Sequence, residues 1–180
     1  MRKLIVTEFL SLDGVMEAPM WTFPYWNDEI AAFKGEETAN NEPLLLGRVT
    51  YEGFASAWPN RSDEDPGATY FNGTRKYVVS TTLDKVEWNN SVLIKGDVIE
   101  EITKLKEEDG PNIVVHGSGK LIQTLMAHDL VDEYRLLVYP LVLGEGQRLF
   151  EDKDKVNLKL VDSRVMSSGV VALVYVPDRQ

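Results

Sequence analysis

The chain has 180 residues, of which 43% are hydrophobic and 27% charged, and its net charge is -10. This size and composition predict one globular domain spanning residues 1–180. The acidic balance argues against general nucleic-acid binding and against docking on anionic membranes, since both need a basic surface. The lack of cysteine excludes disulfides, thiolate nucleophiles and cysteine-based metal sites.

No segment predicts export or a membrane span. The N-terminus meets Glu8 after a short apolar run, too early for a signal peptide. The longest apolar stretches, near residues 136–143 and 170–176, have the length of strands. We therefore expect a cytoplasmic protein.

The first half of the chain predicts strands that alternate with helices. Residues 3–10 are rich in β-formers and predict a central strand, which an irregular aromatic segment follows. Asn27 or Asp28 can cap a helix that runs to about residue 40. The next predicted elements are a strand at 43–46, a helix at 50–57, a polar loop at 60–74, and strands at 76–80 and 92–94.

The second half ends in strands without helices between them. Residues 98–108 predict an amphipathic helix with Ile102 and Leu105 on its apolar face. The elements that follow are a strand at 113–115, a helix at 120–127, and strands at 133–142, 158–165 and 170–177. Early alternation favours a parallel sheet and the final strands an antiparallel edge, so we predict a three-layer α/β domain on a mixed sheet.

Two strand-to-helix turns carry the clearest functional signal. They lie in residues 44–51 (LLLGRVTY) and 113–120 (IVVHGSGK), about seventy residues apart. Each is an apolar run that breaks at glycine and then offers a cation and a hydroxyl where a helix should begin. Because a helix N-terminus presents free N–H groups and a partial positive charge, the two turns could hold two phosphates of one dinucleotide.

Six short motifs follow one another along the chain: SLDGV at 11–15, FPYW at 23–26, LGRVTYE at 46–52, RKYVVS at 75–80, VHGSG at 115–119 and LGEGQRLF at 143–150. In this order they resemble the dihydrofolate reductase-like family, most closely the branch of the bacterial riboflavin-biosynthesis reductase domain and its stand-alone relatives. The resemblance covers nearly the whole chain. It implies a mostly parallel central sheet with antiparallel C-terminal strands and helices on both faces.

The resemblance also implies NADPH, bound across the carboxyl ends of the strands, and hydride transfer to a small unsaturated ring or carbonyl of pterin or pyrimidine type. The Asp13–Gly14 loop would border the nicotinamide. The cofactor residues carried over by motif are Gly47, Arg48 and Thr50 at the first phosphate turn, Ser80, Thr81 and Thr82 beside the adenosine ribose and its 2′-phosphate, Gly117, Ser118, Gly119 and Lys120 at the second phosphate turn, and Leu121 and Ile122 beneath the cofactor.

Two acids are candidates for catalysis. The resemblance places Glu29 at the acidic position of the helix after the first loop, where a carboxylate can hold a proton and orient a substrate. Alternatively, Asp28 and Glu29 only stabilise a helix N-terminus. Asp13 either contacts substrate or nicotinamide, or serves the local geometry of an Asp-Gly turn.

The aromatic segment has two interpretations. Trp21, Phe23, Tyr25 and Trp26 either stack on a flat heterocycle or form a core flap or subunit contact. We assign Trp21, Phe23 and Trp26 to a substrate pocket together with Tyr51.

The remaining polar features are less specific. His116 and His128 lack matching ligands, so we expect no metal site. We expect His116 at the strand end near the cofactor, where it is either packed and hydrogen-bonded or catalytic. Residues 144–146 (GEG) resemble the family's pocket-closing segment or form a plain hairpin, and residues 151–155 predict a solvated loop.

Three functional hypotheses follow. The first is an NADPH-dependent oxidoreductase acting on a small molecule. The second is a nucleotide- or small-molecule-binding module without turnover, and the third is an interaction protein. We expect a homodimer in which an exposed final strand pairs between subunits.

Overall fold

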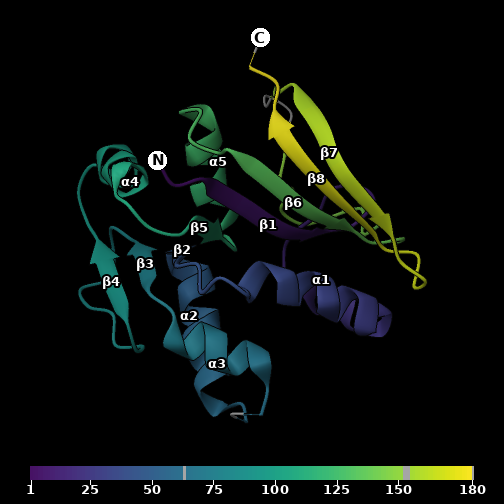
Figure 1. The fold of residues 1–180 in the computed structure, drawn as a ribbon, viewed down its shortest axis with the longest axis horizontal. Helices are drawn as coiled ribbons and strands as arrows, with labels where there is room; N and C mark the ends of the chain where they lie inside the picture. Colours follow the sequence, from purple (N-terminus) through teal and green to yellow (C-terminus); the bar gives the residue numbers. More distant parts are fainter. Residues whose placement is uncertain (63, 152–154, 180) are drawn as a thin grey trace.

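The sheet brings together strands from the whole chain (Figure 1). The computed structural model describes residues 1–62, 64–151 and 155–179. Within these residues, eight strands form one sheet in the order β4-β3-β2-β5-β1-β6-β8-β7. The strands are β1 (Leu4–Leu10), β2 (Leu44–Gly47), β3 (Lys76–Val79), β4 (Ser91–Ile94), β5 (Ile113–Val115), β6 (Glu133–Val138), β7 (Leu158–Val165) and β8 (Val171–Pro177).

The pairing confirms the predicted mixed sheet. All pairs among the first six strands of the chain are parallel, whereas β8 runs antiparallel to both β6 and β7. The parallel strands are short and apolar because both of their faces are covered. In β1, Leu4, Val6 and Leu10 point into one core and Phe9 into the core on the opposite face.

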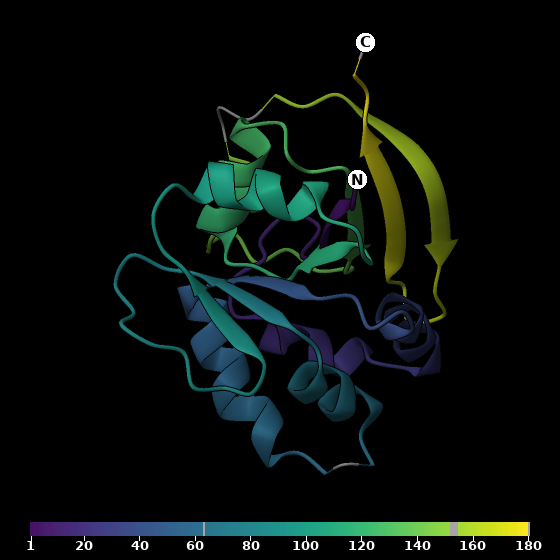
Figure 2. The ribbon, with the colours of Figure 1, turned by 60° about the vertical axis from the view of Figure 1, so that its left-hand side comes forward.

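Helices cover both faces of the sheet (Figures 1 and 2). The helices on one face are α4 (Val98–Glu107) and α5 (Gly119–Ala127), and those on the other are α1 (Asp28–Thr38), α2 (Arg48–Ala57) and α3 (Pro66–Gly73). The aromatic segment forms the 3-10 helix η1 (Pro19–Tyr25), and a second 3-10 helix, η2, spans Trp58–Asn60. In the part of the chain described, no helix has the length and apolar character needed to cross a bilayer.

The predicted loop at 60–74 is partly wrong, because its second half is α3. The Asp65 side chain accepts a hydrogen bond from the Gly67 N–H (2.8 Å), which caps the helix. Tyr70 and Phe71 are buried and pack against the core. An Asp-Pro start and buried aromatic residues thus outweigh the glycine-rich, polar composition.

The predicted exposed final strand is also wrong. β8 lies between β6 and β7, because the chain folds back through β7 and β8 as an antiparallel pair. The edge strand on this side of the sheet is β7, where Val161 and Val165 are exposed. A homodimer stays a prediction, and its candidate surface moves to β7. Of the predicted solvated loop at 151–155, residues 152–154 lie outside the described residues.

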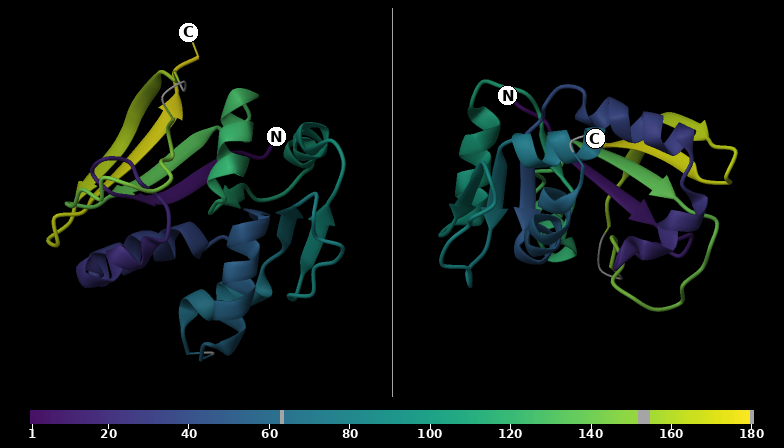
Figure 3. Two further views of the ribbon diagram at one scale, coloured as in Figure 1. Left: turned by 180° about the vertical axis from the view of Figure 1, so that it is seen from behind. Right: turned by 90° about the horizontal axis from the view of Figure 1, so that it is seen from below.

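The carboxyl ends of the parallel strands lie together at one end of the sheet, where β1 and β6 extend beyond β5 (Figure 3, right). The pairing of β1 with β5 ends at Val6 and Val115, whereas its pairing with β6 continues to Leu10. The β5-facing side of β1 beyond Val6 therefore has no strand beside it among the described residues.

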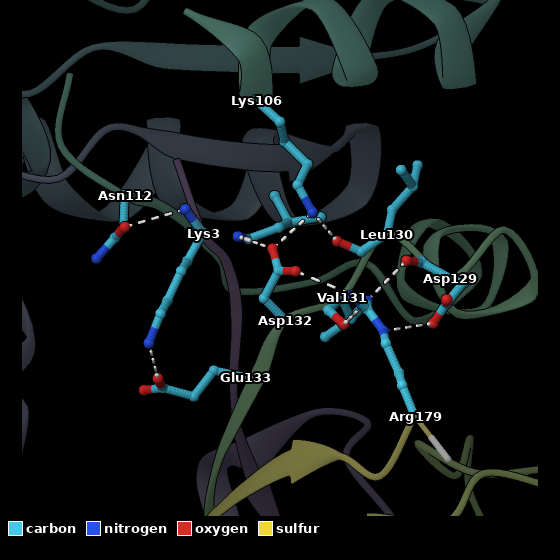
Figure 4. A network of polar contacts seen from close by, with 10 residues as sticks. Lys3, Lys106, Asn112, Asp129, Leu130, Val131, Asp132, Glu133 and Arg179 are labelled. Atoms are coloured by element: carbon cyan, nitrogen blue, oxygen red, sulfur yellow. Dashed lines mark hydrogen bonds and ion pairs between the residues drawn. The ribbon is translucent and has the colours of Figure 1, made fainter. Parts of the chain in front are cut away.

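At the opposite end of the sheet, a polar network joins α4, the start of β6 and the C-terminus (Figure 4). The Lys106 Nζ donates to Asp132 Oδ2 (2.5 Å) and to the Leu130 carbonyl (2.6 Å). Asp132 also accepts the Leu4 N–H (2.8 Å) and lies 3.7 Å from an Arg179 nitrogen. The Lys106 side chain is only 8% exposed, so its charge depends on these partners.

We predict that Asp132→Ala lowers the free energy of unfolding by about 3 kcal/mol, because it leaves the buried Lys106 ammonium without its counter-charge. Urea unfolding at pH 7 measures the effect. Asp84→Ala is the matched control, since Asp84 belongs to an exposed pair with Lys95 (3.7 Å) and should leave the midpoint unchanged. Equal losses in the two variants would contradict the prediction.

Candidate active site

The two glycine turns touch each other. Gly47 precedes α2 and Ser118 precedes α5, and these helices follow the neighbouring strands β2 and β5. The Gly47 N–H donates to the Gly117 carbonyl (3.1 Å). A Cβ atom on Gly47 would lie 2.1 Å from Ser118 Oγ, so only glycine allows this approach.

The other two glycines of the second turn also have close neighbours. Gly117 has φ +114°, and a Cβ there would lie 2.7 Å from Thr50 Oγ1. A Cβ on Gly119 would lie 2.5 Å from Gln147 Nε2. Across the described residues, no side chain caps the start of α2 or of α5. Two helix N-termini therefore present free N–H groups side by side, an arrangement suited to phosphate.

The predicted cations flank this pair of turns. Arg48 is exposed and ion-paired with Glu52 (2.8 Å), and Lys120 is exposed in the first turn of α5. Leu121 and Ile122 are buried in the core beneath α5.

The Ser80 segment lies one strand beyond the first turn. Ser80 Oγ accepts the N–H groups of Thr82 (3.1 Å) and Leu83 (3.0 Å), which closes a turn after β3 and leaves Thr81 and Thr82 exposed. Next to it, an open hollow of about 800 Å³ is lined by Glu52, Leu83 and Trp88, among others. The predicted ribose segment, first turn and second turn thus follow one another along the edge, on β3, β2 and β5.

The structure adds an acid that the sequence analysis missed. Glu8 lies on β1, and its Oε1 atom is buried with no hydrogen-bond partner in the described chain. That oxygen lies 3.6 Å from the position that a Cβ on Gly117 would take. Burial raises the pKa of Glu8 to about 8, while Lys34 lowers it and Glu37 raises it. Glu8 is therefore largely protonated at neutral pH.

One partly buried cation, Lys34, acts on two acids here. The Lys34 Nζ forms an ion pair with Glu37 and donates to Thr7 Oγ1 (2.9 Å), and the Thr7 hydroxyl donates to Glu37 Oε1 (2.9 Å). Glu37 thus takes the counter-charge, and Glu8 is left to remain neutral. Burial and Lys34 also lower the pKa of His116, whose ring packs against Phe54 and Phe71.

A signal for Glu8 was present in the sequence. It is the only acid in the β1 sequence LIVTEFL, and strand alternation places it on the same side as Leu4, Val6 and Leu10. A charged residue at a core position of a central strand is uncommon unless it is paired or functional.

Glu29 occupies a different environment from the one expected of a proton donor. It is exposed in the first turn of α1, where its carboxylate accepts the Ser167 hydroxyl and the Ser167 N–H (2.7 Å). These hydrogen bonds lower the pKa of Glu29, so it is ionised at neutral pH. The geometry is that of a residue tying α1 to the β7–β8 turn, and a catalytic role for Glu29 stays a prediction.

Asp13 fastens the first loop to residues 143–144. Its carboxylate accepts Ser11 Oγ (2.6 Å) and the N–H groups of Leu143 (3.1 Å) and Gly144 (2.8 Å), and these bonds lower its pKa. A Cβ on Gly146 would lie 2.7 Å from Val15 Cγ1. The GEG segment is therefore a loop held against the first loop, with no flanking hairpin strands among the described residues.

The aromatic residues divide between core and surface. Trp21 packs edge-on against Tyr139 (5.4 Å between centroids), whereas Phe23 and Trp26 are 60% and 48% exposed. Trp26 contacts the ring of Phe9 on β1 (6.3 Å). Of the residues predicted for the substrate pocket, Trp21 is therefore packed, whereas Phe23 and Trp26 are exposed.

Tyr51 does not join the aromatic segment. It is buried in a separate core cluster beneath α2 and α3. Its hydroxyl accepts the N–H groups of Glu87 (3.0 Å) and Trp88 (3.1 Å). Where the structure is described, no group of three or more His, Asp or Glu side chains is arranged to hold a metal ion.

We predict that Glu8→Gln becomes stabilising relative to the wild type as pH rises. The pKa of Glu8 is about 8 in the folded protein, whereas the usual value for a glutamate is 4.5. Between these two pH values only the unfolded state releases the proton, so the free energy of unfolding of the wild type falls as pH rises. Glutamine has the same shape and no proton to lose. The difference should grow by up to about 1.4 kcal/mol per pH unit between pH 5 and pH 8.

Urea unfolding across this pH range measures the difference. Glu36→Gln is the control, because Glu36 is exposed and Arg164 holds its pKa below the usual value. Its difference from the wild type should not vary from pH 5 to pH 8. If the free energies of unfolding of the wild type and Glu8→Gln change in parallel with pH, Glu8 is ionised in the folded protein.

Comparison with known proteins identifies relatives along most of the chain. The family model of the RibD C-terminal domain matches residues 2–172. Uncharacterized protein YyaP of Bacillus subtilis is 38% identical over 138 residues, covering 74% of this chain and 73% of YyaP. Uncharacterized protein YwjB of the same organism is 28% identical over 177 residues, covering 94% of this chain and 95% of YwjB.

Solved structures share the fold. A putative riboflavin biosynthesis protein from Shewanella sp. PV-4 superposes with a TM-score of 0.73 at 22% identity, covering 98% of this chain and 99% of that one. Dihydrofolate reductase from Enterococcus faecalis, complexed with NADP(H) and RAB-propyl, gives a TM-score of 0.65 at 17% identity, covering 98% and 96%. The chain therefore has the dihydrofolate reductase-like fold and belongs to the RibD C-terminal domain family.

Proposed function

We propose that the protein is an NADPH-dependent oxidoreductase that reduces a small heterocyclic or carbonyl substrate of pterin or pyrimidine type. The observation that carries the proposal is the contact between the two glycine turns, which sets two uncapped helix N-termini side by side. Membership of the RibD C-terminal domain family supports it.

The chain's own residues would hold the cofactor in extended form. The free N–H groups at the starts of α2 and α5, with Arg48, Thr50 and Lys120, suit the phosphates. The turn at Ser80–Thr82 suits the adenosine ribose. From β3 to β1 there are three strand spacings, roughly 14 Å, a span that an extended dinucleotide can bridge. The bound cofactor would supply the hydride.

The exposed aromatic residues support a flat substrate. Phe23 is 60% and Trp26 48% exposed, and Trp26 packs on Phe9 of the strand that carries Glu8. An aromatic surface beside the carboxyl end of β1 can stack on a planar ring. We propose these two residues for substrate contact, and we keep Trp21 as their packed support.

A binding module without turnover is the second candidate. It is favoured by the engagement of both predicted acids, since Glu29 and Asp13 are ionised and hydrogen-bonded to other loops. A panel of pterin, pyrimidine and quinone compounds with NADPH separates the two. Cofactor oxidation favours the reductase, and cofactor binding without oxidation of NADPH favours the module.

We predict that Lys120→Glu weakens NADPH binding at least tenfold, because it reverses a charge in the first turn of α5. The measurement is a fluorescence titration at pH 7. An acid at a helix N-terminus favours the helix, so loss of folding should not explain the effect.

Lys104→Glu is the control, since Lys104 is exposed in the last turn of α4, on another helix. It should bind NADPH like the wild type. Equal affinity in all three proteins would remove α5 from the site. A folded wild type that fails to bind millimolar NADPH would overturn the proposed function.

A further inference from the structure

Glu8 lies on β1, the strand that follows the two phosphate turns in the order of the sheet. Along the carboxyl edge, the Ser80 turn belongs to β3, Gly47 to β2 and Gly117 to β5, and the following strand is β1 with Glu8. A dinucleotide with its adenosine at Ser80 and its phosphates at the two glycine turns would direct its other end toward β1. That direction rests on the proposed function.

The approach to Glu8 from this side is not occupied by a strand. Pairing between β1 and β5 stops at Val6 and Val115, within the residues described. Glu8 faces the side of the sheet from which α5 starts, because it shares the orientation of Val6 and Leu10. Its Oε1 lies beside Gly117, which makes it a close neighbour of any group that passes the second turn toward β1.

The charges around Glu8 leave its carboxyl group neutral. The groups that act on it from α1 are Lys34 and Glu37, which pair with each other. Directly after β5, His116 is held uncharged by burial. At the starts of α2 and α5, Arg48 is exposed and paired with Glu52, and Lys120 is exposed, so neither is a buried counter-ion for Glu8.

A neutral carboxyl group has one donor and one acceptor in one plane. This pair is complementary to a carboxamide, which offers an acceptor oxygen and a donor N–H in the same geometry. An ionised carboxylate offers acceptors only, and it would face the amide oxygen with a buried, unpaired charge.

We infer that Glu8 is a cofactor-contacting residue whose protonated carboxyl group recognises the carboxamide of the nicotinamide end. The oxygen left without a partner in the described chain is then satisfied by the ligand. The nicotinamide end of the dinucleotide therefore binds well only while Glu8 keeps its proton.

The test measures dissociation constants at pH 7.0 and pH 9.5 for two ligands, NADPH and 2′-phospho-ADP-ribose, which has the same phosphates but no nicotinamide. In the wild type, NADPH affinity should fall at least tenfold between the two pH values, since affinity falls up to tenfold per pH unit above the pKa of a group that must stay protonated. In Glu8→Gln, whose amide keeps a donor and an acceptor, the fall should be less than about threefold.

The second ligand and a control variant complete the design. 2′-Phospho-ADP-ribose should show a fall of less than about threefold in both proteins, because it lacks the carboxamide. Glu36→Gln should behave like the wild type with both ligands. In the ligand-free wild type, carbon-13 NMR should detect one glutamate carboxyl that titrates near pH 8, and this signal should be missing in Glu8→Gln.

Each result has one consequence. Equal pH dependence of NADPH binding in the wild type and Glu8→Gln overturns the inference but not the proposed function. The inference is also overturned if the wild type loses as much affinity for 2′-phospho-ADP-ribose as for NADPH, because the charge would then act on the phosphates. Failure of both ligands to bind a folded wild type at pH 7.0 overturns the proposed function itself.

Discussion

The direct contact between the two glycine turns is the constraint on which the site depends. The Gly47 N–H reaches the Gly117 carbonyl, and no Cβ fits between Gly47 and Ser118. For this contact to form, β2 and β5 must be neighbours and parallel, and α2 and α5 must begin at the same edge on opposite faces of the sheet. The strand order around β5 therefore determines which residues can share one ligand.

The next strand in this order, β1, carries Glu8, whose protonation depends on the charges of Lys34 and Glu37. Lys34 is shared between Glu37 and Glu8, and the closer acid, Glu37, holds it with the help of Thr7. A second buried acid without a partner lowers stability at neutral pH. Such a group at the edge where the helix N-termini meet is typical of a functional site, where stability is lost in favour of binding or chemistry.

The loops around the edge are tied together. The Asp13 carboxylate accepts a hydrogen bond from the Gly144 N–H, and the Glu17 carboxylate accepts one from the Gln147 N–H (2.9 Å). The Gln147 side chain in turn packs against Gly119 at the start of α5. The first loop, the GEG loop and the second phosphate turn thus form one continuous set of contacts.

The local pattern of the sequence determined most of the elements and the two turns, because apolar periodicity and glycine act over a few residues. Gly47 and Gly117 could be recognised in this way, and ordered motifs such as SLDGV indicated the family. The partners of Glu8, Glu29 and Tyr51 were decided only by the tertiary structure. Each contacts residues far away in the chain, as Glu29 contacts Ser167 and Tyr51 contacts Trp88. Whether an acid is buried or tied at the surface depends on the order of the strands, and that order follows from packing rather than from any short segment.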